Sequence, residues 1–103
     1  MPKTVRIASV DELQPGQMKA VDVDDRRIAV ANLGGAYFAF DAVCTHAGAA
    51  LDEGEIDGET VVCPMHGGQF NIKTGGVESP PPRKAIATYK VQVVGRDIHV
   101  EVP

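Results

Sequence analysis

The middle of the chain, residues 42–82, constrains the fold most, because it holds both cysteines and two of the three histidines. The segment is rich in glycine and proline, and most of it shows neither the helical nor the strand period. A loop-rich stretch of about forty residues is uncommon inside a compact domain unless something orders it. The sequence therefore predicts that this segment is organised around a structural or functional centre.

Both ends of the chain, by contrast, are predicted to form short strands joined by tight turns. Apolar and polar residues alternate there, and turn signals separate the runs, among them Pro15-Gly16, Gly34-Gly35 and Gly95-Arg96. Residues 24–27 are interpreted as a further hairpin turn, and residues 10–13 as a single helical turn capped by Ser9. The expected strands cover residues 4–9, 18–23, 28–33, 36–40, 86–94 and 98–102.

This pattern predicts an all-β fold in a single domain over residues 1–103. Alternation assigns one side of each strand to the core, and in the last hairpin these inward residues are Tyr89, Val91, Val93, Ile98, Val100 and Val102. The other aromatic residues of the predicted strands, Tyr37, Phe38 and Phe40, are also expected to pack in the core.

The charge balance excludes one class of partner. Ten Lys plus Arg stand against fourteen Asp plus Glu, which gives a formal net charge of −4. No basic block is present to follow a phosphate backbone, so nucleic acid is not an expected partner. No apolar run approaches the ~20 residues of a membrane helix, and the start of the chain does not resemble a signal peptide. We therefore expect a cytoplasmic protein with no membrane partner.

Two short motifs within the middle segment carry the chemistry. Cys44-Thr45-His46 and Cys63-Pro64-Met65-His66 place the same two side-chain types, in the same order, in two separate loops. Thiolates and imidazoles suit zinc or an iron-sulfur centre, and two cysteines could also form a disulfide. A cytosolic disulfide is disfavoured and would not explain the paired histidines. A Cys2His2 zinc site normally places its cysteines together on one knuckle, whereas here each loop mixes the two types.

The mixed pattern resembles the Rieske family, over about residues 18–102. The resemblance depends on Cys44-Thr45-His46-Ala47-Gly48, on Cys63-Pro64-Met65-His66-Gly67-Gly68 with Phe70 following, and on the Gly75-Gly76 turn before a proline loop. It implies stacked small antiparallel sheets with two cluster-binding loops, and one 2Fe-2S cluster per chain. Cys44 and Cys63 would bind the inner iron, and His46 and His66 the outer iron.

One branch of the family differs from this chain in an informative way. Rieske domains of respiratory and photosynthetic complexes carry an extra cysteine in each loop, where this sequence has Ala49 and Met65. The same branch has hydroxyl donors to sulfur at the positions of Gly68 and Phe70. Without those hydrogen bonds the potential is expected toward the lower end of the Rieske range of ~ −150 to +300 mV. The chain is thus similar to soluble, low-potential Rieske ferredoxins.

The resemblance also implies a function and its partners. Such ferredoxins serve multicomponent aromatic-ring-hydroxylating dioxygenases, so the expected role is transfer of single electrons from a flavin-containing NAD(P)H reductase to a terminal oxygenase. No nucleophile and base pair stands out in the sequence, so the chain itself is expected not to be an enzyme. Two alternatives stay open, namely the small subunit of an NADH-dependent nitrite reductase and a zinc-stapled interaction module.

Four further features have a structural and a functional interpretation. His99 alternates with buried positions and is expected on the surface rather than as a metal ligand. The prolines at 80–82 are expected to form a stiff cover over the loops. Gly48, Gly67 and Gly68 are either sites of close approach to a cluster or ordinary turn residues. The acidic residues Asp52, Glu53, Glu55 and Asp57 form either a solvated face or a patch that attracts a basic partner.

Overall fold

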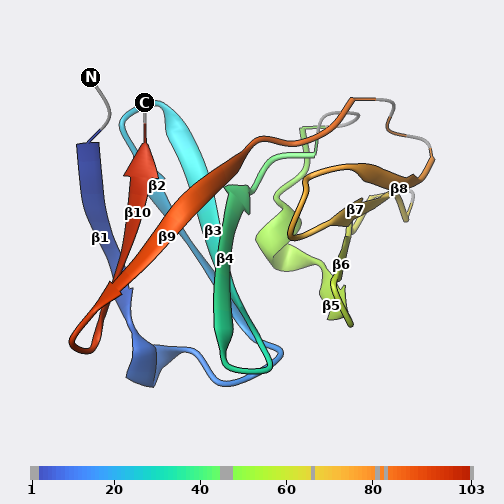
Figure 1. Ribbon diagram of the computed structural model, residues 1–103. Helices are drawn as coiled ribbons and strands as arrows, with labels where there is room; N and C mark the ends of the chain where they lie inside the picture. The colour runs from blue at the N-terminus through green and yellow to red at the C-terminus, as the bar shows by residue number, and fades with distance from the viewer. Residues whose placement is uncertain (1–2, 45–47, 66, 81, 83, 103) are drawn as a thin grey trace.

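The computed structural model describes residues 3–44, 48–65, 67–80, 82 and 84–102. Two antiparallel sheets make up this part of the chain, one of six strands and one of four (Figure 1). The four-stranded sheet projects from one side of the six-stranded sheet, and the first and last described strands lie in the larger sheet. The predicted all-β class, with small antiparallel sheets, is confirmed.

The six-stranded sheet is built from the two ends of the chain. Its order is β1-β10-β9-β4-β3-β2, and every pairing is antiparallel. The two edge strands contact each other, and Lys3 of β1 forms an ion pair of 2.7 Å with Asp24 beyond the end of β2. The sheet is therefore curled. Its strands are β1 (Lys3–Ser9), β2 (Met18–Val23), β3 (Arg26–Leu33), β4 (Ala36–Asp41), β9 (Thr88–Val94) and β10 (Asp97–Val102).

Most of the predicted strands and turns match this sheet. Ser9 caps a short 3-10 helix, η1 (Val10–Glu12), and its hydroxyl accepts from the Asp11 N–H while Glu12 accepts from the Ser9 N–H. The predicted turn at residues 24–27 is too long: the turn is Asp24-Asp25 alone, and β3 already begins at Arg26. Asp24 adopts a left-handed φ of 55°, which a short polar side chain tolerates, so the two arginines can pair with β2.

One core fills the inside of the curled sheet. The inward positions predicted in β10, Ile98, Val100 and Val102, are buried, and Tyr89 and Val91 of β9 pack against this core. The prediction for Val93 is wrong, because 45% of this residue is exposed near the turn that joins β9 to β10. Alternation thus predicts the buried face within the sheet but not at the tip of its hairpin.

The middle of the chain holds more regular structure than the sequence predicts. Each of its strands has only three residues, too few to show a period, and together they form the sheet β5-β6-β7-β8. A 3-10 helix, η2 (Leu51–Glu53), precedes them. The strands are β5 (Glu55–Asp57), β6 (Thr60–Val62), β7 (Gln69–Asn71) and β8 (Val77–Ser79).

A second core joins the two sheets, and β3 and β4 contribute to both cores. Ile28 and Val30 of β3 face the first core, whereas Ala29 and Ala31, which alternate with them, face the second. The small alanines leave room for large side chains of the four-stranded sheet, such as Phe70. The second core comprises Ala29, Ala31, Phe40, Ala42, Cys44, Leu51, Val61, Cys63, Phe70, Ile72 and Ile86, and both cysteines lie in it.

Candidate metal centre

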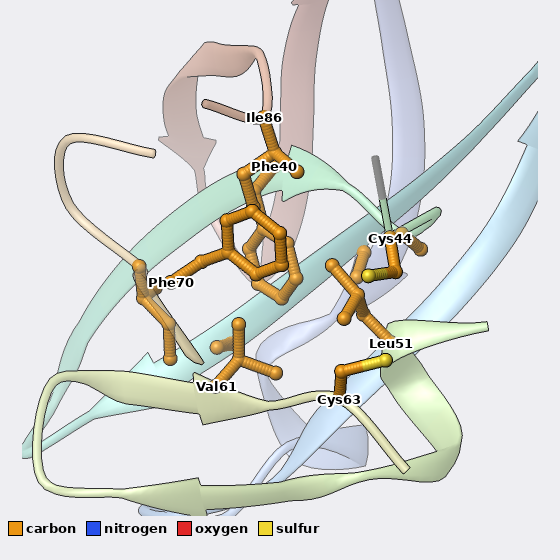
Figure 2. Packing of buried hydrophobic residues seen from close by; sticks show 11 residues of the cluster. Phe40, Cys44, Leu51, Val61, Cys63, Phe70 and Ile86 are labelled. Carbon is orange, nitrogen blue, oxygen red and sulfur yellow. The ribbon is translucent and has the colours of Figure 1, made fainter. Parts of the chain in front are cut away.

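The two cysteines lie together at one end of the second core. Figure 2 shows both thiols beside Leu51, with Phe40, Phe70 and Val61 further along the same cluster. Both are free thiols, and only 2% of Cys44 and 1% of Cys63 is exposed. The disulfide interpretation is therefore not supported, and the sheets bring together the two thiols predicted to be ligands.

The Cys63 thiol is affected by its burial and by the Cys44 thiol. Burial is the main reason that the pKa of the Cys63 thiol is raised, and the neighbouring Cys44 thiol raises this pKa further. The backbone N–H of Met65 donates to the Cys63 sulfur and lowers the same pKa. Two buried sulfur atoms side by side, one already accepting a backbone N–H, form a donor set suited to a soft metal centre.

The two predicted histidine ligands, His46 and His66, lie outside the described residues, as do Thr45, Ala47 and Pro81. Among the residues that the structure does describe, no three His, Cys, Asp or Glu side chains gather in a way that could hold a metal ion. The structure thus supports the cysteine half of the predicted ligand set, and the histidine half stays a prediction.

The two loops that follow the cysteines close in the same way. The Cys44 N–H donates to the carbonyl of Ala49 at 2.9 Å, and the Cys63 N–H donates to the carbonyl of Gly68 at 2.7 Å. In both loops the acceptor is thus the fifth residue after the cysteine. We call residues 44–49 the first ligand loop and residues 63–68 the second ligand loop.

A glycine with left-handed backbone sits at the same place in each loop. Gly48 has a φ of 68° and Gly67 a φ of 70°, and each is the fourth residue after its cysteine. At both positions, apart from the chain neighbours, no atom of the described residues lies within 4 Å of where a Cβ would be. The left-handed backbone shows a turn requirement at both positions, and the close approach to a cluster stays a prediction.

The two loops differ in what they are attached to. Three residue pairs of β6 and β7, from Thr60↔Asn71 to Val62↔Gln69, lead directly into the second ligand loop. The first ligand loop is flanked by only one bridge, Val43↔Ala50, and by the bond from the Leu51 N–H to the Ala42 carbonyl. We call residues 41–43 and 50–52 the entering leg and the leaving leg of the first ligand loop.

Apolar side chains are exposed beside both cysteines. Val43, directly before Cys44, is 41% exposed, and Met65, in the second ligand loop, is 49% exposed. Residues 42–51 and 60–71 carry no Asp, Glu, Lys or Arg. We call the surface around Val43 and Met65 the uncharged tip. The local sequence pattern does not predict that these two side chains are exposed, although the lack of charged residues in both motifs is a signal for such a surface.

The remaining sequence candidates have structural roles of other kinds. His99 is half-buried on β10, where it pairs with Arg6 and Gln92 across the six-stranded sheet. Within the acidic stretch, Asp52 is not simply solvated: only 14% of its side chain is exposed, and it forms an ion pair with Arg27. Of the proline loop, Pro82 is buried and Pro80 exposed.

The family model of the Rieske [2Fe-2S] domain matches residues 3–90. The chain belongs to the Rieske [2Fe-2S] domain family. This family binds an iron-sulfur cluster, which favours the cluster over a structural zinc ion at the paired cysteines.

Three comparisons place this Rieske domain among ferredoxins. It is 39% identical over 97 residues to the biphenyl dioxygenase ferredoxin subunit of Pseudomonas sp. (strain KKS102), covering 93% of this chain and 89% of that one. The ferredoxin of carbazole 1,9a-dioxygenase from Nocardioides aromaticivorans IC177 superposes with a TM-score of 0.89 at 36% identity, covering 94% and 95% of the two chains. A ferredoxin solved in complex with the carbazole 1,9a-dioxygenase oxygenase has a TM-score of 0.90 at 33% identity, covering 94% and 91%.

A further likeness separates the alternatives named above. The putative NADH-dependent nitrite reductase small subunit from Mycobacterium tuberculosis has a TM-score of 0.88 but only 23% identity, so it shares the fold.

No helix among the described residues is long and apolar enough to cross a membrane.

Proposed function

We propose that this single Rieske domain is a cytoplasmic one-electron carrier, the ferredoxin component of an aromatic-ring-hydroxylating dioxygenase system. The observation that carries this proposal is the pair of buried, interacting thiols on two loops of matched geometry. The relatives at 33–39% identity named above are ferredoxins of such systems. They are carriers rather than catalysts, so the bond chemistry belongs to their partners.

The cluster-binding residues are assigned as follows. Cys44 and Cys63 would hold the inner iron of a 2Fe-2S cluster, one per chain, and His46 and His66 would hold the outer iron. When bound, this cluster supplies a centre that accepts and releases one electron at a time. The protein's own contribution is to exclude water from the two sulfur atoms, which are almost fully buried, and to donate the Met65 N–H to one of them.

The sequence of the loops supports a potential in the lower part of the Rieske range. Gly68 and Phe70 offer no side-chain donor to a sulfur atom, and Phe70 is packed in the second core. Fewer hydrogen bonds to sulfur stabilise the extra negative charge of the reduced state less well. Such a potential suits a carrier placed between a flavin-containing NAD(P)H reductase and a terminal oxygenase, the two partners that we assign to it.

Metal content and spectroscopy test the cluster assignment. The purified protein should be red-brown, contain iron and acid-labile sulfide, and give, after reduction, an EPR signal with an average g value below that of the free electron. His46→Ala and His66→Ala should each abolish this signal, whereas the matched control His99→Ala should keep it because His99 lies in β10. A colourless protein with one bound zinc ion would overturn the proposal.

The uncharged tip is where we expect the partners to dock. Val43→Ser with Met65→Gln should slow electron transfer to the oxygenase of a biphenyl dioxygenase system by roughly tenfold, since buried apolar contacts dominate such interfaces. The control Val93→Ser with Val94→Gln changes two exposed valines on the β9–β10 hairpin and should leave the rate unchanged. Equal slowing by both double variants would argue against docking at the tip.

A further inference from the structure

We propose that two consecutive arginines of β3, Arg26 and Arg27, position the first ligand loop by holding its two legs from opposite faces of the six-stranded sheet. The inference deepens the proposed function and rests on it, because that function assigns the loop to cluster binding. Among the described residues, a single bridge flanks the first ligand loop, so its legs need support from elsewhere in the fold.

The leaving leg is held by Arg27. Its Nε and Nη2 atoms donate to the two carboxylate oxygens of Asp52 at 3.0 and 2.8 Å, a two-point contact that fixes direction as well as distance. Asp52 directly follows Leu51, whose side chain is buried in the second core and whose N–H donates to the Ala42 carbonyl. Arg27 also approaches the exposed Asp22 at 3.6 Å, so its charge is shared between two carboxylates.

The entering leg is held by Arg26 through a tyrosine. The hydroxyl of Tyr89 donates to Asp41, and Arg26 Nη1 donates to the same hydroxyl at 3.1 Å. Asp41 is the last residue of β4, three positions before Cys44, and its N–H donates to the Ala87 carbonyl at 2.9 Å. The chain thus leaves β4 with both its backbone and its side chain anchored.

The alternation of β3 explains how one strand reaches both legs. Arg27 follows the parity of Ala29 and Ala31, which face the second core and the four-stranded sheet. Arg26 follows the parity of Ile28 and Val30, which face the first core, where Tyr89 also packs. The backbone carbonyl of Arg27 completes the arrangement by accepting from the Ala42 N–H at 2.9 Å.

The second ligand loop is supported differently: Thr60 of β6 and Asn71 of β7 both donate to the carboxylate of Glu78 on β8. Its legs are strands β6 and β7, and residues 60–71 carry no Asp, Glu, Lys or Arg to form an ion pair. Loss of the contacts that Arg26 and Arg27 make with the legs should therefore disturb the first ligand loop and leave the second in place.

Iron release and hydrogen exchange of the cluster-loaded protein test this inference. Asp52→Asn should release iron to a chelator about tenfold faster than wild type, the lower limit typical for residues that support metal ligands. Deuterium uptake should rise in peptides covering residues 40–52 and stay unchanged in peptides covering residues 60–72. Tyr89→Phe, which removes one hydroxyl, should act in the same direction on the entering leg.

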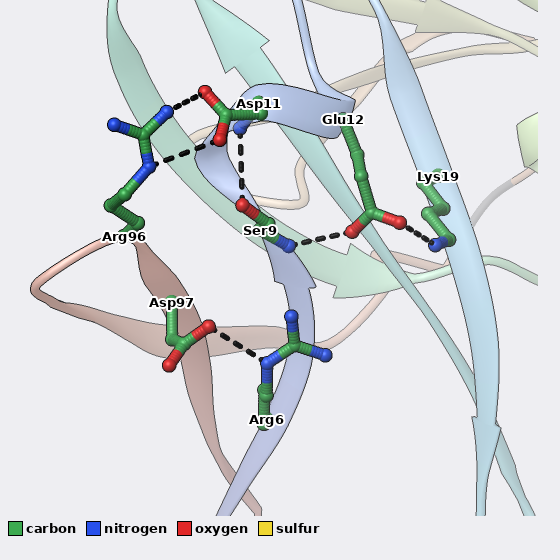
Figure 3. Close-up of polar contacts among 7 residues, drawn as sticks. All are labelled: Arg6, Ser9, Asp11, Glu12, Lys19, Arg96 and Asp97. Carbon is green, nitrogen blue, oxygen red and sulfur yellow. Dashed lines mark hydrogen bonds and ion pairs between the residues drawn. The ribbon is translucent and has the colours of Figure 1, made fainter.

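A second bidentate arginine pair provides the matched control. Arg96 contacts both carboxylate oxygens of Asp11 at the η1 end of the molecule (Figure 3). Asp11→Asn should leave iron release, loop exchange and the EPR spectrum at wild-type values. The exchanged pair Arg27→Asp with Asp52→Arg should restore slow iron release.

The inference is overturned if Asp52→Asn releases iron at the wild-type rate, or if it loosens both loops equally. Failure of the proposed function would appear in the wild-type chain itself, as a colourless protein without iron, and is therefore distinguishable.

Discussion

The two ligand loops have the same internal geometry but different supports. Each closes through a bond from the cysteine N–H to the carbonyl five residues on, with a left-handed glycine just before that acceptor. The second loop continues a strand ladder, whereas the legs of the first are contacted by side chains from distant β3 and β9. The residues of a ligand loop thus determine its local shape, but the surrounding fold determines where the loop is placed.

The largest effect should come from removing either sulfur, because the proposed function has each loop supply one thiolate to the same centre. Cys44→Ser and Cys63→Ser should both yield protein without iron and without visible absorption. Metal analysis and absorption spectroscopy of the purified variants measure this. Full iron content in one variant but not the other would break the equivalence of the two loops.

The next effect should fall on the ladder that supports the second ligand loop. A Cβ at Gly54 would lie 1.9 Å from the carbonyl oxygen of Val62, the last residue of β6, so Gly54→Ala must push this leg aside. We expect a loss of roughly 2 to 3 kcal/mol in the free energy of unfolding, as for overpacking. Denaturant titration measures it.

Gly76 provides the control for the Gly54 substitution. The nearest atom to a Cβ there is the hydroxyl oxygen of Thr74 at 3.3 Å, and its φ is not left-handed. Gly76→Ala should therefore lower the stability far less. Similar losses in the two variants would show that the close approach at Val62 does not matter.

A smaller and matched effect is expected at the two left-handed glycines. Apart from the chain neighbours, a Cβ at Gly48 or Gly67 meets no atom of the described residues within 4 Å, so Gly48→Ala and Gly67→Ala penalise the backbone conformation, by about 1 to 2 kcal/mol. The same denaturant titration should give equal losses for both variants. A loss confined to one of them would contradict the common closure of the loops.

Much of this comparison could be predicted from the sequence, because its signals are local. Alternation and turn dipeptides indicated the strands of the larger sheet, and the two Cys/His motifs indicated the loops and their chemistry. The three-residue strands of the smaller sheet were missed, since three residues cannot show a period.

Other features depend on residues far apart in the chain. Arg27 and Asp52 are 25 positions apart, and Tyr89 and Asp41 are 48 apart. Arg27 was assigned to a turn and Asp52 to an acidic run, although β3 and η2 bring them together. Nothing in the local pattern marks such pairs, because their partners are chosen by the topology.

The smallest effect that we predict is a loss of stability at low pH, caused by protonation of Asp52 on the leaving leg of the first ligand loop. The hydrogen bond from Arg27 holds the pKa of Asp52 below its ordinary value of 3.8, against an opposing effect of burial. The folded state therefore binds this proton less tightly than the unfolded state. The resulting stabilisation is complete above the ordinary pKa and is lost as the pH falls through the lowered one.

The difference in denaturant midpoint between wild type and Asp52→Asn should accordingly shrink on acidification below about pH 4. The control Asp57→Asn removes a carboxylate from an exposed position at the end of β5 and should give a smaller difference throughout. If wild type and Asp52→Asn differ by the same amount at every pH, Asp52 does not stabilise the fold through its charge. Support of the first loop would then come from packing around Leu51, and the two loops would differ less than their contacts suggest.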